Sequence, residues 1–493
     1  QITEDIDEEG NPVEDKDSTP NVWEEPPRDD DQDKEHILVE KEKEFDLALR
    51  KFISAVNGVE LKGENSREPV VDTLKLISGE STTAEYNHTK EPVIVTPKDI
   101  VEYRLRVYNE GEVAGYAELV MDDIPEGVEM IKPSYDENGN ALNLNAKYRW
   151  IMYKNVTGTE KADIVHDGKY YVKTDKVEEA VLIVTDYLSM ENGEKMKSDA
   201  NSENPNLIKE FNSKESNMLD FKDLRVEFKV KPANKADVVI TNKAQITEDL
   251  DYKENSVIDR DSTPNVWEES PRDDDQDIEN IKVKYFDLAL YKWVSTTYIT
   301  ENGKTKEYAS EHTQDDKSKV VNVTIPKDKL DKTVVKFKYS IKVENQGKLA
   351  GYAKEVKDHI PQGLKFVAED NTKYGWELQQ DGTITTEYLK DTLLQPGQTA
   401  EVEVVLTWIN GENNLSEKWN YAEISKDYNE YDAPDIDSTP DNFENEVRED
   451  DEDKDVVMLN VRTGSVVIAF AVIGLVVMGI VTAGVVGIKK YVL

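Results

Sequence analysis

Two similar phrases place a lysine on an apolar strand face. In FDLALRKFI, strict alternation puts Lys51 beside phenylalanine, leucine and isoleucine, and in FDLALYKWV the matching residue is Lys292. An acid and an amide follow the same rule further along, as Asp122 in VMDDIPEG and Asp358 in VKDHIPQG, and as Asn242 in TNKAQI and Asn420 in WNYAEI. Each half of the chain therefore aims one lysine, one aspartate and one asparagine into a predicted core.

These three residue types can react with one another. Burying an unpaired charge is costly, so the groups must meet or become neutral, and desolvation lowers a lysine pKa while it raises an aspartate pKa. A neutral amine beside a carboxamide, with a protonated aspartate polarising the carbonyl, is arranged for nucleophilic attack. Loss of ammonia would leave a Lys–Asn isopeptide bond, and we expect it to join the first and last strands of a module.

A structural role is the alternative for the same residues. A strand lysine can extend its amine to water, an aspartate before Ile-Pro can cap a turn, and an asparagine near a strand end can pair with backbone. Agreement at all three positions in two modules favours the bond.

An acidic segment occurs three times, from Gln1, Gln245 and Glu423. Its carboxylate and amide oxygens recur at matching places and predict Ca²⁺ ligands: Asp5, Asp7, Asp15, Asp17 and Asn21; Asp249, Asp251, Asp259, Asp261 and Asn265; Asp427, Asp435 and Asp437. A bound cation would stiffen a joint between modules. The alternative is a self-repelling extended linker without metal, and both interpretations stay open. Neither the calcium-bound joint nor the metal-free linker requires a cofactor, and Ca²⁺ is the one ion predicted.

Most of the charge lies in these segments. The net charge is −42, and residues 1–40, 245–280 and 422–455 hold 16, 13 and 15 acids against three bases each. This balance argues against nucleic acid as a partner, since phosphate binding needs clustered lysine and arginine. The chain has no cysteine, which excludes disulfides and thiolate sites.

The elements that must position the inward residues are strands. Val101–Ile131 and Val334–Val367 alternate apolar and polar residues around matching glycine turns. Short strands with such turns predict an all-β class, with tandem β-sandwich modules. A further run, Ser465–Ile488, carries no charge, is long enough to cross a bilayer as a helix, and is followed by Lys489 and Lys490.

The predicted order along the chain follows from these features. It is the tail of a preceding repeat module and an acidic joint (1–40), module one with an insertion (41–251), an acidic joint (252–280), module two (281–427), an acidic juxtamembrane segment (428–464), a transmembrane helix (465–488) and a cytoplasmic tail (489–493). The insertion in module one includes Met190–Leu207, predicted as a loop or short hairpin.

The phrases FDLALRKFIS, NEGEVAGYAELVMDDIPEG and NKAQITED resemble isopeptide-forming Ig-like domains of Gram-positive pilins and surface adhesins, and the repeat domains of clostridial surface proteins. The resemblance covers nearly the whole chain before the apolar run. It implies Ig-like sandwiches in which a first-strand lysine bonds to a last-strand asparagine with help from an acid. Carried over by position, these are Lys51, Asn242 and Asp122, then Lys292, Asn420 and Asp358.

The expected function is that of a cell-surface stalk or adhesin-like protein, not an enzyme. We expect a single-pass membrane protein with its N-terminal part outside and its C-terminus in the cytoplasm. A sortase signal is not recognisable, because LNVRTG lacks the proline of such a motif. The alternatives are an adhesin that binds a host or matrix ligand, through the insertion or through further N-terminal modules, and a surface enzyme acting on carbohydrate or peptide through paired acids.

Overall fold

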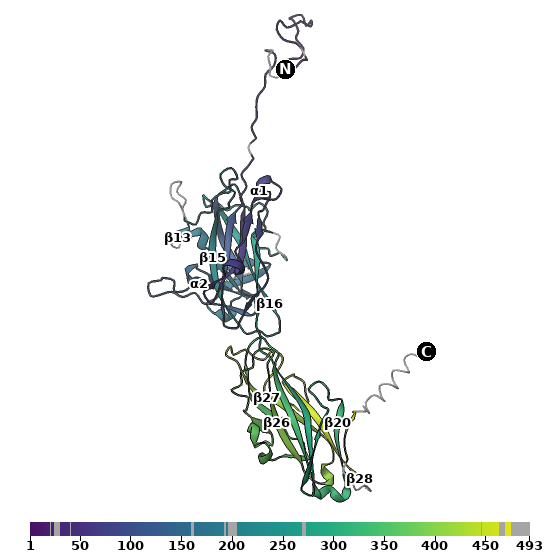
Figure 1. Cartoon of the computed structure of the whole chain (residues 1–493). Helices are drawn as coiled ribbons and strands as arrows, with labels where there is room; N and C mark the ends of the chain where they lie inside the picture. Colours follow the sequence, from purple (N-terminus) through teal and green to yellow (C-terminus); the bar gives the residue numbers. More distant parts are fainter. Residues whose placement is uncertain are drawn as a thin grey trace, which may run out of the picture. The chain divides into compact units, whose positions relative to one another are not determined.

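The structure is a computed structural model that describes residues 1–19, 21–23, 30–39, 41–158, 162–191, 194–195, 205–268, 273–444, 446–462 and 469–474 (Figure 1). Strands dominate these residues, and the all-β prediction is confirmed. The helices described there are short: α1 (Leu74–Ser78), α2 (Leu144–Lys147), and the 3₁₀ helices η1 (Gly63–Asn65), η2 (Val177–Glu179), η3 (Tyr187–Ser189), η4 (Lys327–Lys332), η5 (Ala368–Asp370), η6 (Thr372–Tyr374) and η7 (Glu412–Asn414).

Module one is a sandwich of two sheets. The first sheet has the order β2-β1-β6-β15-β8 and contains β1 (Leu47–Val56), β2 (Val59–Glu60), β6 (Ile100–Asn109), β8 (Val128–Met130) and β15 (Phe221–Val230). The second has the order β10-β11-β9-β12-β7-β16-β17-β5 and contains β5 (Val93–Val95), β7 (Gly115–Asp123), β9 (Ile151–Val156), β10 (Ile164–His166), β11 (Lys169–Lys173), β12 (Leu182–Thr185), β16 (Val239–Asp251) and β17 (Gln276–Val283). Two small hairpins pair β3 (Val70–Asp72) with β4 (Glu85–Asn87), and β13 (Met190–Glu191) with β14 (Glu194–Lys195).

Module two repeats this plan. Its first sheet has the order β19-β18-β21-β26-β23 and contains β18 (Leu288–Glu301), β19 (Lys304–Ala309), β21 (Thr333–Asn345), β23 (Leu364–Phe366) and β26 (Thr399–Trp408). Its second has the order β24-β25-β22-β27-β28-β20-β29 and contains β20 (Lys319–Pro326), β22 (Tyr352–His359), β24 (Glu377–Leu378), β25 (Ile384–Thr386), β27 (Ser416–Tyr428), β28 (Glu452–Arg462) and β29 (Ala469–Gly474).

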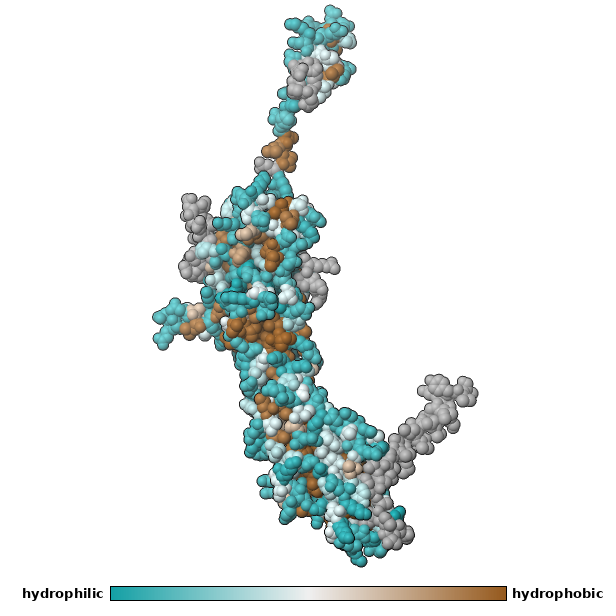
Figure 2. Space-filling view, in the orientation of Figure 1, coloured by the Kyte–Doolittle hydropathy of each residue, from teal (hydrophilic) through white to brown (hydrophobic). Residues whose placement is uncertain are grey.

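The period-two pattern of the sequence produces both cores. Along β21, Val335, Phe337, Tyr339, Ile341 and Val343 are all fully buried, because alternate side chains of a strand point to the same face. Each such side chain contributes about 1.5–3 kcal/mol by leaving water. Their polar neighbours point outward, and hydrophilic residues cover most of the visible face of both modules (Figure 2). The core of each sandwich therefore lies between its two sheets.

The predicted boundaries of the acidic segments are wrong. Residues assigned to the joint at 252–280 and to the juxtamembrane segment at 428–464 include β17 and β28, which pair antiparallel with β16 and β27. Both strands carry acids that face inward and are paired there, as Asp277 is by Lys90 at 2.8 Å and Asp455 is by His312 at 2.6 Å. The residues that pair with these acids are distant in sequence. From the sequence alone, an acidic strand of this kind therefore cannot be distinguished from a solvated acidic linker. The modules therefore extend beyond residues 251 and 427.

The predicted transmembrane helix at 465–488 lies largely outside the described residues. The part that is described, Ala469–Gly474, is not helical but forms β29 along the free edge of β20. Among the residues whose placement the structure gives, no helix combines the length and the apolar character needed to cross a bilayer. The predicted tail at 489–493 also lies outside the described part.

Residues Gln1–Glu44 form a unit of their own. Within it, Asp7 accepts bonds from the backbone N–H groups of Glu9 and Asn11, both at 2.9 Å. The matching Asp251 accepts from Lys253 and Asn255, both at 2.8 Å. The first and second acidic copies thus fold alike at this turn.

Candidate functional site

Three strands of module one bring Lys51, Asp122 and Asn242 together, as the sequence predicts. Lys51 lies on β1, Asp122 on β7 and Asn242 on β16, and each side chain is at most 1% exposed. The Lys51 amine forms an ion pair with Asp122 Oδ2, and Asn242 Nδ2 donates to Asp122 Oδ1 at 2.7 Å. One carboxyl group therefore contacts both the amine and the amide, through its two oxygens.

Module two builds the same triad from β18, β22 and β27. The Lys292 amine pairs with Asp358 Oδ2, and Asn420 Nδ2 donates to Asp358 Oδ1 at 2.7 Å. None of the three side chains is exposed. Because the modules share little sequence outside their common phrases, this repeated geometry is a property of the shared fold rather than of one local environment.

An aromatic ring closes each triad on the side of the amine. The Lys51 amine lies 5.0 Å from the ring centre of Tyr103, and the Lys292 amine lies 4.7 Å from that of Tyr339. Both tyrosines are buried on the central strand of the first sheet. The rings exclude water from the lysines, which strengthens every electrostatic interaction within the triads.

Burial moves the protonation equilibria toward neutral groups. It raises the pKa of Asp122 to about 7, although the nearby Lys51 acts in the opposite direction. Burial also lowers the pKa of Lys292, against the effect of Asp358. A neutral amine and a protonated acid are the states that nucleophilic attack on an amide requires.

Each asparagine has a side-chain oxygen that accepts no hydrogen bond in the described structure. The Oδ1 atoms of Asn242 and Asn420 are buried without a hydrogen-bond partner in the described structure. Leaving such an acceptor unpaired costs about 1–3 kcal/mol. Turning either amide by half a turn would bring this oxygen against the aspartate carboxyl, where a protonated acid could donate to it. The turn would also break the bonds that Nδ2 donates to Asp123 O in module one and to His359 O in module two. The arrangement can therefore polarise the carbonyl that a lysine would attack.

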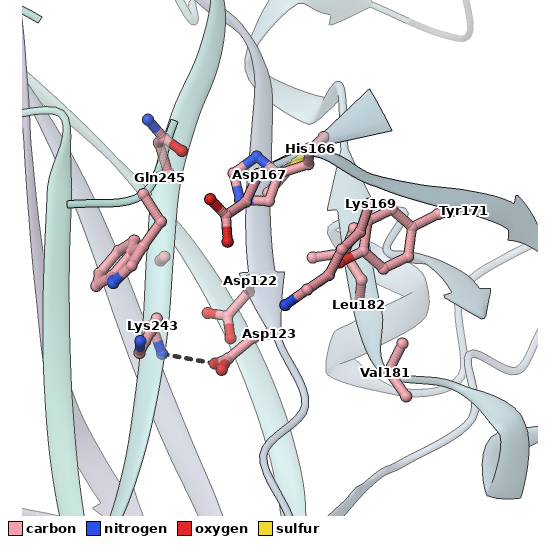
Figure 3. Close-up of a pocket in the computed structure, with 13 residues that line it drawn as sticks. Asp122, Asp123, His166, Asp167, Lys169, Tyr171, Val181, Leu182, Lys243 and Gln245 are labelled. Atoms are coloured by element: carbon pink, nitrogen blue, oxygen red, sulfur yellow. Dashed lines mark hydrogen bonds between the residues drawn. The ribbon is translucent and has the colours of Figure 1, made fainter. Parts of the chain in front are cut away.

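A pocket of about 150 Å³ opens beside the triad of module one, on the outer face of the second sheet (Figure 3). Asp123 lines it from β7, and Lys243 and Gln245 line it from β16. His166 of β10 and Lys169 of β11 line the opposite side. The backbone N–H of Lys243 donates to Asp123 Oδ1 at 2.6 Å. Since Lys243 and Asn242 are adjacent on β16, they point to opposite faces, and the pocket lies outside the core that holds Asn242.

The predicted Ca²⁺ ligands are only partly brought together. Carboxylate oxygens lie within 4.8 Å of one another in the sets Asp46, Asp259, Asp261 and Asp274; Asp287, Asp435, Asp437 and Asp450; Asp249, Asp259 and Asp275; and Asp15, Asp17 and Asp30. The predicted acids outside these sets are Asp5, Asp7, Asp251 and Asp427, and the amides of Asn21 and Asn265 donate to Thr3 O and Thr247 O. Asp7 and Asp251 each hold a turn by accepting backbone N–H groups through Oδ1, and their role as ligands stays a prediction.

Sequence reasoning missed the acids that complete these sets. Asp46 and Asp287 follow the phenylalanine of the two FDLAL phrases, and Asp274 and Asp450 lie in the acidic runs. Burial and neighbouring carboxylates raise the pKa of Asp287 to about 7, and burial raises that of Asp435 to about 8. The aspartate that recurs in both FDLAL phrases could have indicated these clusters, because an acid at the start of a buried apolar strand needs a partner for its charge.

No family model and no curated protein matches the chain. Among solved structures, it is similar to the major pilin subunit BcpA of Bacillus cereus, with 10% identity and a TM-score of 0.20 over 74% of this chain and 67% of that one. It is also similar to the Actinomyces fimbrial adhesin FimA, with 10% identity and a TM-score of 0.15 over 81% of this chain and 98% of that one. Red sea bream transglutaminase matches with 7% identity and a TM-score of 0.17 over 81% of this chain and 32% of that one. Two of these are bacterial pilin or fimbrial proteins.

Contrary to the prediction, the asparagines do not lie on the last strands of their modules. Among the described strands, β17 follows β16 in module one, and β28 and β29 follow β27 in module two. A bond would therefore link the first strand to the second-last strand in module one and to the third-last strand in module two.

Proposed function

We propose that this chain is a structural cell-surface protein, a stalk or adhesin-like molecule whose modules are each locked by one Lys–Asn isopeptide bond. The observation that carries the proposal is the buried Lys–Asp–Asn triad, which occurs with the same atom-to-atom contacts in both modules. A buried lysine and asparagine that contact the same carboxyl group are placed for this reaction.

The bond would form in one balanced exchange. The neutral Lys51 amine attacks Asn242 Cγ, while Asp122 donates its proton to the carbonyl oxygen and takes one from the attacking nitrogen. Collapse of the intermediate expels the amide nitrogen as ammonia, with the protons returned through Asp122, which is restored. No oxidant, reductant or cofactor is consumed. Lys292, Asn420 and Asp358 would do the same in module two.

The bond would suit a protein under tension. Tension entering at β1 would pass from Lys51 directly to Asn242 and leave through β17. Residues between these two positions, which include β6, β7 and β15, would then carry none of the load. A stalk that holds a distal region away from a cell surface needs this property.

Intact mass measurement tests the proposal. The wild-type chain should be lighter than its sequence mass by two ammonia molecules, and peptide mapping should recover Lys51 joined to Asn242 and Lys292 joined to Asn420. Mapping is essential because an N-terminal glutamine such as Gln1 also loses ammonia when it cyclises. A chain whose mapped lysines and asparagines are all unlinked would refute the bonds.

Membrane anchoring is part of the same proposal. The uncharged run Ser465–Ile488 followed by two lysines supports it. Insertion of the whole run would require β29 to leave the edge of β20. Fractionation of cells that express the full chain, compared with a chain ending at Arg462, tests this: the anchor is absent if both partition alike.

A ligand-binding adhesin is the second candidate. The β13–β14 hairpin of module one has no counterpart among the described strands of module two, which favours a separate use for it. Deletion of residues 190–207 should abolish binding to host or matrix preparations if the hairpin holds the ligand. Unchanged binding would show that the hairpin does not hold the ligand, and the structural role would be the only one supported.

A further inference from the structure

Four carboxylates from two distant parts of the chain meet in each module. In module one they belong to Asp46, next to the start of β1, and to Asp259, Asp261 and Asp274 of the acidic segment. In module two they belong to Asp287, Asp435, Asp437 and Asp450. Asp46, Asp274 and Asp287 are only 0%, 6% and 7% exposed, whereas Asp261 and Asp437 are exposed. Each cluster therefore joins buried or half-buried acids to one that faces solvent.

Several oxygens in these clusters have nothing to bind. Asp46 Oδ1, Asp274 Oδ2 and Asp287 Oδ1 are buried without a hydrogen-bond partner in the described structure. Their side chains converge with the other carboxylates to within 4.8 Å. Buried carboxyl groups that face one another need either protons or a shared cation.

The remaining oxygens are held in place by the same bonds in both modules. Asp259 Oδ2 accepts from the backbone N–H of Leu47 at 2.8 Å, and Asp435 Oδ2 accepts from Leu288 at 2.7 Å. The hydroxyl of Ser262 donates to Asp274 Oδ1 at 3.1 Å; in module two the corresponding bond joins Ser438 to Asp450, at 2.7 Å. Asp259 and Asp435 also accept backbone N–H groups through Oδ1, at 3.2 Å and 3.4 Å, so the fold orients both oxygens of these two carboxylates and one oxygen of Asp274 and of Asp450.

Module one supplies two cations of its own next to the cluster, Arg260 and Arg50, and Arg50 Nη1 donates to Asp274 O at 2.8 Å. Arg260 forms an ion pair with Asp46 Oδ2, on the side of that carboxylate away from its unpartnered oxygen. Module two has Ile436 at the matching position. Two guanidinium groups cannot neutralise four acids, and module two has Tyr291 in place of Arg50. Without a bound cation these acids can become neutral only by taking up protons.

We propose that each four-carboxylate cluster is a Ca²⁺ site. All the ligands are hard oxygens, and Ca²⁺ accepts six to eight of these in flexible geometry, with backbone oxygens and water completing the set. Neither nitrogen nor sulfur ligands, which favour transition metals, belong to the clusters. The excess of carboxylates over protein cations matches a divalent ion.

Module one holds an adjoining second position. Asp249 and Asp275 share Asp259 with the first cluster, and both oxygens of Asp275 and Oδ1 of Asp249 are buried without partners in the described structure. Asp275 is 1% exposed and Asp249 is 5% exposed. The two positions would therefore bind a pair of ions bridged by Asp259.

The sites would act within a module rather than between modules. Asp46 and Asp287 adjoin the first strand, whereas the other ligands come from the segment that follows β16 or β27. The backbone reinforces this contact, since Leu49 N–H donates to Asp274 O and Leu290 N–H donates to Asp450 O, both at 2.7 Å. A bound ion would clamp the returning acidic segment onto the strand that carries the lysine.

The first acidic copy provides a contrast. Asp15, Asp17 and Asp30 lie close together, but all three are exposed and no fourth acid joins them in the described residues. We propose no site there. Titration of the chain should therefore detect ions only in the two modules.

Calorimetric titration of the full metal-free chain with Ca²⁺ tests the inference. Up to about 10 mM Ca²⁺, above the roughly 10⁻⁴–10⁻³ M dissociation constants typical of extracellular modules, we expect about three ions to bind. Ca²⁺ should also raise the thermal midpoint, and Mg²⁺ at the same concentration should do so less. Absence of binding heat together with an unchanged midpoint in the wild-type chain would overturn the proposal without any variant.

Variants locate the ions. Asp46→Asn and Asp287→Asn keep the side-chain shape and remove one charge, and each should weaken its own site about tenfold or more, since Ca²⁺ affinity depends on ligand charge. The exposed Asp175 and Asp391 belong to no cluster in the described structure, so Asp175→Asn and Asp391→Asn are matched controls. Equal binding by all four variants would overturn the assignment.

The inference does not depend on the isopeptide bonds. Lys51→Met should retain Ca²⁺ binding while it loses one cross-link, and Asp46→Asn should retain both cross-links by mass. The two proposals can therefore fail separately.

Discussion

Removing both charges of the module-one triad distinguishes a covalent bond from an ion pair. The double variant Lys51→Met/Asp122→Asn replaces both buried charges with neutral side chains of similar size and prevents bond formation. If only an ion pair exists in the wild type, its replacement should be neutral or should stabilise the module by about 1–4 kcal/mol, because desolvating two charges is costly.

A covalent bond predicts the opposite sign. The loop closed between Lys51 and Asn242 spans about 190 residues, and a cross-link over such a loop stabilises by about 5 kcal/mol through the entropy of the unfolded chain. Loss of the bond should therefore lower the thermal midpoint of module one by about 10–20 °C. The loop from Lys292 to Asn420 spans about 130 residues and gives a similar figure for module two.

Differential scanning calorimetry of the full chain, paired with intact mass, measures both consequences. The double variant should lose one ammonia fewer than the wild type and melt earlier in one transition only. The surface pair Lys229–Glu129, 3.4 Å apart, provides the control Lys229→Met/Glu129→Gln, which should change neither mass deficit nor midpoint. A double variant that melts at or above the wild-type temperature, with an unchanged ammonia deficit, would refute the reasoning.

Two further predictions concern protonation and packing. In Lys51→Met, Asp122 loses the cation that lowers its pKa, so its folded pKa should be at least the value of about 7, above the unfolded value of 3.8. The folded state then holds a proton that the unfolded state releases, so the free energy of unfolding should fall as the pH rises from 4 to 7. The fall should be steeper than in Lys51→Met/Asp122→Asn by up to about 1.4 kcal/mol per pH unit. Denaturant titrations that give the two variants the same dependence of unfolding free energy on pH would contradict this. In Gly351→Ala, the added Cβ would overlap the Phe286 ring and come within 2.9 Å of Tyr428 O, so the variant should lose about 1–3 kcal/mol in urea unfolding, and an unchanged midpoint would contradict the packing.

The triads were predictable because their signal is local. Alternation along a strand fixes which face a residue occupies, so Lys51, Asp122 and Asn242 could each be assigned to the core from a few neighbours. The two modules then supplied independent copies of the same pattern. The contacts within the triad follow from a general rule, since buried charges must find one another.

The acidic segments were less predictable because their partners are distant. Glu279 lies on β17 and pairs with Arg67, more than 200 residues earlier in the chain. Nothing near Glu279 in the sequence indicates that pairing, so an acid on a core strand resembles an acid in a linker. The strand β17 and the boundary it moves could be recognised only from the fold.

The all-β class, the two modules and the inward direction of each lysine, aspartate and asparagine could be predicted from the amino-acid sequence, because all of these follow from a period of two residues. Which acids are buried, and which groups they face, depends on how the strands pack. That packing brings Asp46 to Asp259 and Asp274, and it returns the acidic segment to the sheet as β17. Such contacts join positions with no common periodicity, and only the closed sandwich defines them.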